Sequence, residues 1–182
     1  MLKSLFIAFF LSFPFFIKGE AQTTEQSKSS GLKKCTVFTA GDDNVNSYRI
    51  PSLLTAKDGT LLVFCEARRD SWRDKSRTDI VVKRSEDIGK TWSIMQDLTQ
   101  GTTGAYMDPT PVLDSITGRI FLFTTFWPAE DHSGAKNRAI LITSGDNGKT
   151  WSLPVDVTSA IIPAGYHIVG FGPGAGLQMS GE

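Results

Sequence analysis

Two aspartates recur at the same place in two near-copies of one eight-residue pattern. Asp87 lies in SEDIGKTW (85–92), and Asp146 lies in SGDNGKTW (144–151). Paired carboxylates are common equipment for acid–base chemistry, but each aspartate belongs to a separate copy and is expected to lie far from the other. We therefore predict a hairpin turn in which Asp accepts backbone N–H bonds, Gly takes a conformation costly for other residues, and Trp packs beneath.

Arg49 and Asp108 form a second candidate pair, of opposite charge. A shift of 59 residues places Arg49 on Asp108, and a proline follows each of them closely. Equivalent positions in successive repeats point toward the same region, so a cation and an anion could line one pocket. Taken alone, Arg49 is better explained by a surface salt bridge or a cap on the adjacent strand.

The most charged stretch of the chain is ARRDSWRDKSRTD (67–79). Most of these charges are expected to be solvated on a loop. The whole chain has nineteen basic and nineteen acidic residues, and its Lys and Arg form no basic stripe, which argues against nucleic-acid binding. His132 and His167 have no ligand spacing around them, so no metal site is expected.

The elements that must position these residues also follow from the repeat. Applied without a gap, the shift of 59 residues places Phe64 on Phe123 and Ser85 on Ser144. Each copy has a short strand, a glycine turn, an apolar strand, a variable loop and a third strand, rich in β-branched and aromatic residues. No convincing amphipathic helix is found. The expected fold class is all-β, built from antiparallel repeats.

A repeat of three or four antiparallel strands and about 60 residues suits one blade of a β-propeller. A single blade cannot bury both faces of its sheet and must stack on neighbours. We expect about two and a half blades in this chain, the N-terminal portion of a larger ring.

The doubled turn pattern resembles the Asp-box of sialidases, and Tyr48-Arg49-Ile50-Pro51 resembles their N-terminal Arg-Ile-Pro signature. The resemblance extends over residues 36–182. It implies a six-bladed propeller and a retaining exo-α-sialidase that removes terminal sialic acids from glycoconjugates, with Asp-boxes away from catalysis. Sialylated glycans would be the partners. The resemblance implies no cofactor and no metal.

The resemblance also assigns the charged residues. Arg49 would be the first of three arginines that hold the sialic acid carboxylate, a task that suits the planar, always ionised guanidinium. Asp74 follows Arg68 by six residues, as the catalytic Asp of the family does, and would be the general acid/base. Asp70 is the alternative in the same loop. Asp79, which opens the next strand, also keeps the family distance.

Four further residues match substrate contacts of the family. Glu66 and Arg68, two apart and on one face of a strand, would lie near the 4-hydroxyl of the sugar. Asp108 would contact the acetamido group and the same hydroxyl. Met107 would lie against the N-acetyl methyl, with ordinary core packing as an equal alternative.

Other conspicuous residues admit two interpretations each. Trp72 and Trp127 could stack on the aglycone sugar or be packed loop aromatics. Gly172-Pro173-Gly174-Ala175-Gly176 lacks the helix and Lys of a phosphate loop, and is interpreted as tight backbone beside the pocket.

The sialidase nucleophile, a Tyr with a Glu partner, and the other two arginines have no counterpart within 182 residues. The chain is therefore expected to be an N-terminal fragment, inactive alone, whose incomplete propeller domain covers 36–182 and stops inside a third blade. The alternative is a secreted carbohydrate-binding Asp-box propeller without catalysis.

A secretory signal peptide is predicted at 1–21 from a charged start, a short apolar run and small residues at its end. A polar linker is expected at 22–35. The protein would be exported, to the periplasm, the cell surface or beyond, and would meet the membrane only through its signal peptide. Cys35 and Cys65 could pair, although two buried free thiols are the favoured interpretation.

Overall fold

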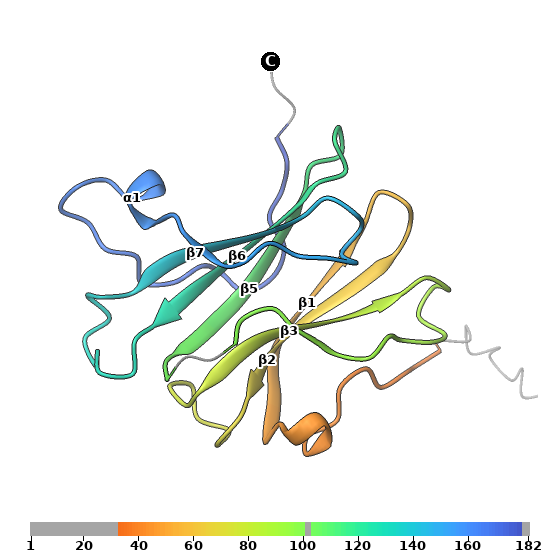
Figure 1. Cartoon of the computed structure of the whole chain (residues 1–182), viewed down its shortest axis with the longest axis horizontal. Helices are drawn as coiled ribbons and strands as arrows, with labels where there is room; N and C mark the ends of the chain where they lie inside the picture. The colour runs from red at the N-terminus through yellow and green to blue at the C-terminus, as the bar shows by residue number, and fades with distance from the viewer. Residues whose placement is uncertain (1–32, 101–102, 180–182) are drawn as a thin grey trace, which may run out of the picture. The chain divides into compact units, whose positions relative to one another are not determined.

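The computed structural model describes residues 33–100 and 103–179, within which the chain forms eight strands and two short helical turns (Figure 1). The strands are β1 (Ser47–Thr55), β2 (Leu61–Arg68), β3 (Thr78–Ser85), β4 (Gln96–Asp97), β5 (Ala105–Leu113), β6 (Ile120–Trp127), β7 (Arg138–Ser144) and β8 (Val155–Asp156). The helical turns are η1 (Asp42–Asn44) and α1 (Thr158–Ile161). The predicted all-β class is confirmed. The predicted signal peptide (1–21), most of the predicted linker and residues 180–182 lie outside the described residues.

The strands form two antiparallel groups within one sheet. The sheet order is β1-β2-β3-β5-β6-β7-β8, with β4 paired to β3. The two groups meet where β3 and β5 run parallel, in the single pairing of Thr78 with Ala105. We call β1–β4 the first repeat and β5–β8 the second repeat; Figure 1 shows them in orange to green and in green to blue.

The strand register corrects the gapless alignment of the repeats. In the first repeat Arg49 pairs with Glu66, and in the second repeat Met107 pairs with Thr125. Arg49 is therefore equivalent to Met107, at a shift of 58 residues, and not to Asp108. The physical reason is the turn between the first two strands, which is one residue longer between β5 and β6 than between β1 and β2.

The core lies where alternate side chains of the two repeats pack together. Leu62, Phe64, Ile80 and Val82 of the first repeat join one cluster with apolar side chains of β5, β6 and β7. Burial of each such side chain stabilises the fold by about 1.5–3 kcal/mol. The opposite face of the first repeat has a smaller cluster that includes Val45, before β1.

The Asp-containing turns have the predicted geometry. Asp87 Oδ1 accepts the Thr91 N–H at 2.9 Å and Oδ2 accepts the Thr91 hydroxyl at 2.7 Å, while the Gly89 N–H donates to Ser85 Oγ at 2.8 Å. Gly89 has a φ of 78°, in the left-handed region. The hydrogen bonds from Thr91 and Ser85 lower the pKa of Asp87 to about 2. The carboxylate is thus used within its own turn.

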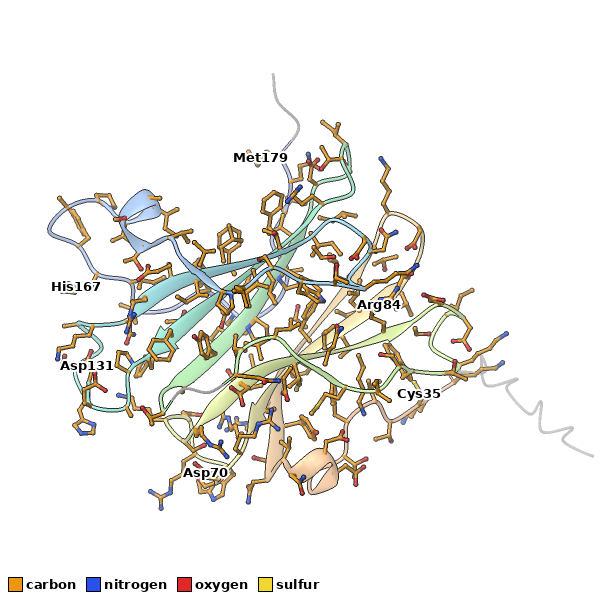
Figure 2. All side chains as sticks on the ribbon, viewed as in Figure 1. Cys35, Asp70, Arg84, Asp131, His167 and Met179 are labelled. Atoms are coloured by element: carbon orange, nitrogen blue, oxygen red, sulfur yellow. The ribbon has the colours of Figure 1, made fainter. Side chains whose placement is uncertain are left out.

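The second such turn also joins the two repeats. Trp151 meets Phe64 of the first repeat edge to face, with ring centroids 5.6 Å apart. Arg84, labelled in Figure 2, donates from Nε to the Asn147 carbonyl at 3.1 Å. The turn therefore supports the packing of one repeat on the other.

The glycine-rich segment 172–176 lies against the first strand of the second repeat. Thr110 Oγ1 donates to the carbonyl of its first glycine at 2.8 Å, and the Gly176 N–H donates to the Pro111 carbonyl at 2.9 Å. A Cβ on Gly176 would collide with the side chain of Val112. The predicted tight backbone is confirmed.

Both cysteines are free thiols, but only Cys65 is buried; Cys35 is exposed, because it precedes the packed part of the first repeat. The prediction that both are buried was therefore wrong for Cys35. No helix in 33–100 or 103–179 is long and apolar enough to cross a bilayer. Over the same ranges, His, Cys, Asp and Glu side chains form no cluster of three that could hold a metal ion.

Candidate active site

Arg68 ends β2 with its side chain only 1% exposed. Its Nε and Nη2 donate to Oε2 of Glu66 at 3.0 and 2.7 Å. Its Nη1 donates to the carbonyl oxygen of Trp72 at 2.6 Å and lies 2.7 Å from Oδ1 of Asp74. One guanidinium thus connects a buried carboxylate to an exposed one.

Glu66 lies beneath Arg68 with 0% of its surface exposed. Its second oxygen, Oε1, accepts the backbone N–H of Asp108 at 3.0 Å. Burial raises the pKa of Glu66, although the hydrogen bonds from the Asp108 N–H and from Arg68 oppose the shift. Both carboxylate oxygens are used inside the protein.

Asp74 is the most exposed of the predicted charged site residues. Its side chain is 68% exposed, and its Oδ1 also lies 3.5 Å from Nη1 of Arg49, which is 47% exposed. Arg49 comes from β1, Arg68 from β2 and Asp74 from the loop between β2 and β3. The first repeat therefore brings all three together.

The loop that carries Asp74 is closed at its base by Arg69, whose N–H donates to the Arg77 carbonyl at 2.9 Å. The guanidinium of Arg69 pairs with Asp79 at 2.8 Å and also with Asp97. Asp70, labelled in Figure 2, pairs instead with Arg77 at 3.3 Å. Asp79 thus anchors the loop, and Asp70 faces a different arginine from Asp74.

Asp108 lies in a strand irregularity that recurs in both repeats. The pairing of β5 with β6 shifts register between Met107 and Thr110, and Asp108 has a φ of 58°. In β1 the register shifts after Arg49, where Ile50 has a φ of 53°. Bulges of this kind redirect side chains and are common beside functional sites.

The surroundings of Asp108 are partly dry. Burial raises its pKa, against the lowering effect of Arg68 and with a further raising effect from the charge of Asp74. A Cβ on Gly170 would lie 3.4 Å from Asp108 Oδ2, so the glycine allows the backbone to pass close by. Met107 is half-buried beside it and its carbonyl accepts the Thr124 hydroxyl at 2.6 Å.

The two loop tryptophans differ. Trp72 is 65% exposed, with the Arg73 guanidinium 5.9 Å from its ring centroid. Trp127 lies under the ammonium group of Lys75, 4.2 Å from its ring centroid. Lys75 also donates to the His132 carbonyl at 3.4 Å, so it joins the Asp74 loop to the second repeat.

The sequence did not identify two of these contacts. The Trp72 carbonyl is a backbone acceptor for Arg68, and residue type gives no signal for it. Lys75 was one of several charges in a loop expected to be solvated, and only its adjacency to Asp74 could have suggested a role.

The assembled site combines two guanidiniums with an exposed carboxylate and a partly buried one. Arg49 offers a planar, half-exposed fork suited to an anionic group such as a carboxylate. An exposed carboxyl group beside it can exchange protons with a bound molecule. The arrangement suits recognition of an acidic small molecule with acid–base chemistry next to its charge.

A model of the BNR repeat-like domain matches residues 59–181, which include both Asp-containing turns, Arg68, Asp74 and Asp108. The chain belongs to the BNR repeat-like domain family. The predicted resemblance to sialidases is confirmed by its relatives. A sialidase of Paraclostridium sordellii is 34% identical over 166 residues, which cover 81% of this chain and 41% of that protein. A sialidase of Bacteroides fragilis is 31% identical over 163 residues, covering 78% of this chain and 30% of the relative.

Solved structures place this BNR repeat-like chain in the same group. The Hadza microbial sialidase Hz136 matches with a TM-score of 0.60 and 30% identity, over 65% of this chain and 27% of that one. An intramolecular trans-sialidase from Ruminococcus gnavus matches with a TM-score of 0.67 over 79% of this chain and 55% of that one; at 18% identity this supports the fold alone. The chain spans well under half the length of the two curated relatives named above.

Proposed function

We propose that this chain supplies the arginine and general-acid part of the active site of an exo-α-sialidase, a retaining glycoside hydrolase acting on terminal sialic acids of glycoconjugates. The observation that carries the proposal is the position of Asp74, whose Oδ1 lies between the guanidiniums of Arg49 and Arg68. A negatively charged sugar would place its carboxylate against Arg49. Its glycosidic bond would then lie within reach of Asp74.

In the proposed reaction Arg49 binds the substrate carboxylate through its planar fork. Asp74 in its acid form donates a proton to the glycosidic oxygen as the bond to the anomeric carbon breaks, and the aglycone leaves as an alcohol. The Asp74 carboxylate then takes a proton from the water that releases sialic acid. The contact of Asp70 with Arg77 favours Asp74 over Asp70 for this role.

Asp108 is proposed to contact the acetamido group and the 4-hydroxyl, with Met107 against the N-acetyl methyl. Their half-buried position beside the bulge of β5 supports this assignment. Arg68 would reach the 4-hydroxyl only by exchanging one of its present partners, since its side chain is 1% exposed.

We further propose that β1–β4 and β5–β8 are two neighbouring blades of a six-bladed propeller. The Tyr nucleophile, its Glu partner and two further arginines would come from sequence beyond residue 182. The greater length of the relatives supports this proposal. Residues 1–21 are proposed to direct export to the periplasm, the cell surface or the medium.

The test compares the 182-residue chain with the protein made from its complete reading frame, using a fluorogenic α-sialoside. We expect hydrolysis, with retention of anomeric configuration, by the complete protein and none by the 182-residue chain. Hydrolysis by the short chain would overturn its proposed inactivity. Binding of sialyllactose by the complete protein without hydrolysis would establish the alternative, a carbohydrate-binding propeller.

A further inference from the structure

Glu66 is the least accessible member of the charged cluster. None of its surface is exposed, and its two oxygens accept three hydrogen bonds, two from Arg68 and one from the Asp108 N–H. A ligand in contact with Arg49 or Asp74 would find no free oxygen on Glu66. Its role must therefore be exerted through the residues it binds.

The repeat separates two parts of that role. The register makes Thr125 the counterpart of Glu66, because Glu66 pairs with Arg49 and Thr125 pairs with the equivalent Met107. Thr125 Oγ1 accepts the backbone N–H of Phe171 at 2.9 Å. Both residues thus accept one N–H from the chain segment that follows their own repeat.

The negative charge of Glu66 is the part that this shared task does not explain. A neutral hydroxyl performs the task in the second repeat. There the counterpart of Arg68 is Trp127, which carries no charge. The carboxylate occurs in the repeat that buries a guanidinium, and an unpaired buried guanidinium would be strongly unfavourable.

The geometry of Arg68 shows what the pairing achieves. With Nε and Nη2 held by Glu66, Nη1 is left to meet the Trp72 carbonyl and Asp74. The same Glu66 carboxylate holds the N–H of Asp108, a non-glycine residue at a φ of 58°. One buried group therefore orients a residue on each side of the boundary between the repeats.

We propose that Glu66 is a positioning residue, which fixes Arg68 and Asp108 relative to one another and contacts no ligand itself. The link to sialoside turnover rests on the proposed function, whereas the positioning of Arg68 does not. The two are therefore tested separately.

The first experiment follows the Arg68 Nε–H by 15N NMR in the full chain, with Arg68→Lys identifying its signal. Glu66→Gln keeps an acceptor for Asp108 but places an amide N–H against the guanidinium. We expect solvent exchange of the Arg68 Nε–H to accelerate at least tenfold. The Arg69 Nε–H, which Asp79 holds, should exchange as before and is the internal control.

Thr125→Val is the matched control, because it removes the equivalent acceptor in the second repeat without touching a charge. It should leave Arg68 exchange unchanged. Unchanged Arg68 exchange in Glu66→Gln, or equal acceleration in Thr125→Val, would overturn the proposal. If Glu66→Gln fails to fold, Glu66→Gln/Arg68→Met should restore folding, because it removes the unpaired guanidinium. A double variant no more stable than the single one would overturn the proposal too.

The second experiment uses the complete protein and measures sialoside kinetics. Glu66→Gln should lower kcat/KM at least tenfold, and Glu66→Asp, which keeps the charge, should recover part of the loss. Accelerated exchange in a complete protein whose unmodified form does not hydrolyse sialosides would support the positioning role and refute the proposed function alone. Unchanged kcat/KM in Glu66→Gln of an active protein would refute the positioning role.

Discussion

Arg68 Nη1 and Asp74 Oδ1 lie 2.7 Å apart, although one side chain is 1% exposed and the other 68%. This contact joins the end of a buried strand to the middle of an exposed loop. Because Arg68 is itself held by Glu66, the position of Asp74 depends on the core of the first repeat as well as on its own loop.

Asp74→Asn should reduce kcat of the complete protein by roughly 100-fold or more, the usual contribution of a general acid. Asp70→Asn, in the same loop but paired with Arg77, should change kcat by only a few-fold. Hydrolysis of a natural sialoside measures both. Loss of activity from Asp70→Asn with retained activity in Asp74→Asn would reverse the assignment.

Arg49→Lys should weaken binding of the substrate carboxylate, because an ammonium group cannot form two parallel hydrogen bonds. Hydrogen bonds to charged groups contribute about 1.5–3 kcal/mol, so KM or the Kd of free sialic acid should rise about 10- to 100-fold. Arg77→Lys, which changes an exposed arginine paired with Asp70, should leave both constants near their original values. Equal effects from the two variants would contradict the role of Arg49.

Gly148→Ala should destabilise the fold more than Gly59→Ala. Both glycines have positive φ, 76° and 90°, and a left-handed Ala costs about 1–2 kcal/mol at either site. A Cβ at Gly148 also meets the side chain of Leu62 across the repeat boundary, whereas a Cβ at Gly59 meets nothing within 4 Å. Overpacking adds about 1–3 kcal/mol, so urea unfolding should separate the variants by that amount.

Asp87→Asn should flatten the dependence of Tm on pH in acid. The pKa of Asp87 is about 2 in the folded chain, below its ordinary 3.8, so between pH 4 and pH 2 the unfolded chain binds a proton that the folded chain does not. Stability therefore falls as the pH falls through this window. Calorimetry should show a smaller fall in Asp87→Asn, together with a lower Tm at pH 7. An identical fall in both proteins would contradict the prediction.

One thiol should react in the folded chain and two in the unfolded chain. Burial raises the pKa of Cys65 to about 12, which keeps it protonated at neutral pH, and its Sγ–H donates to the Arg49 carbonyl at 2.9 Å. Cys35 is exposed. A thiol reagent at pH 8 should label Cys35 quickly and Cys65 only in denaturant. Cys35→Ser should abolish the fast phase; rapid labelling that remains would contradict the burial of Cys65.

The repeat and its strands could be predicted from the sequence, because alternating apolar residues and turn-forming Asp and Gly act over short distances. The two Asp turns formed as expected for this reason. The register of the first strands could not be predicted, because a one-residue difference in turn length is decided by pairing across the sheet.

The residue types of the candidate site were visible in the sequence as Arg49, Arg68 and Asp74. Their grouping depends on strand pairing, which places Arg49 opposite Glu66, and on the loop closed by Arg69. The contact between Glu66 and Asp108 joins residues 42 positions apart on different repeats. Local sequence determines which side chains and turns are available, whereas the packing of one repeat against the other decides which charges are buried together, because burial and pairing are properties of the assembled sheet.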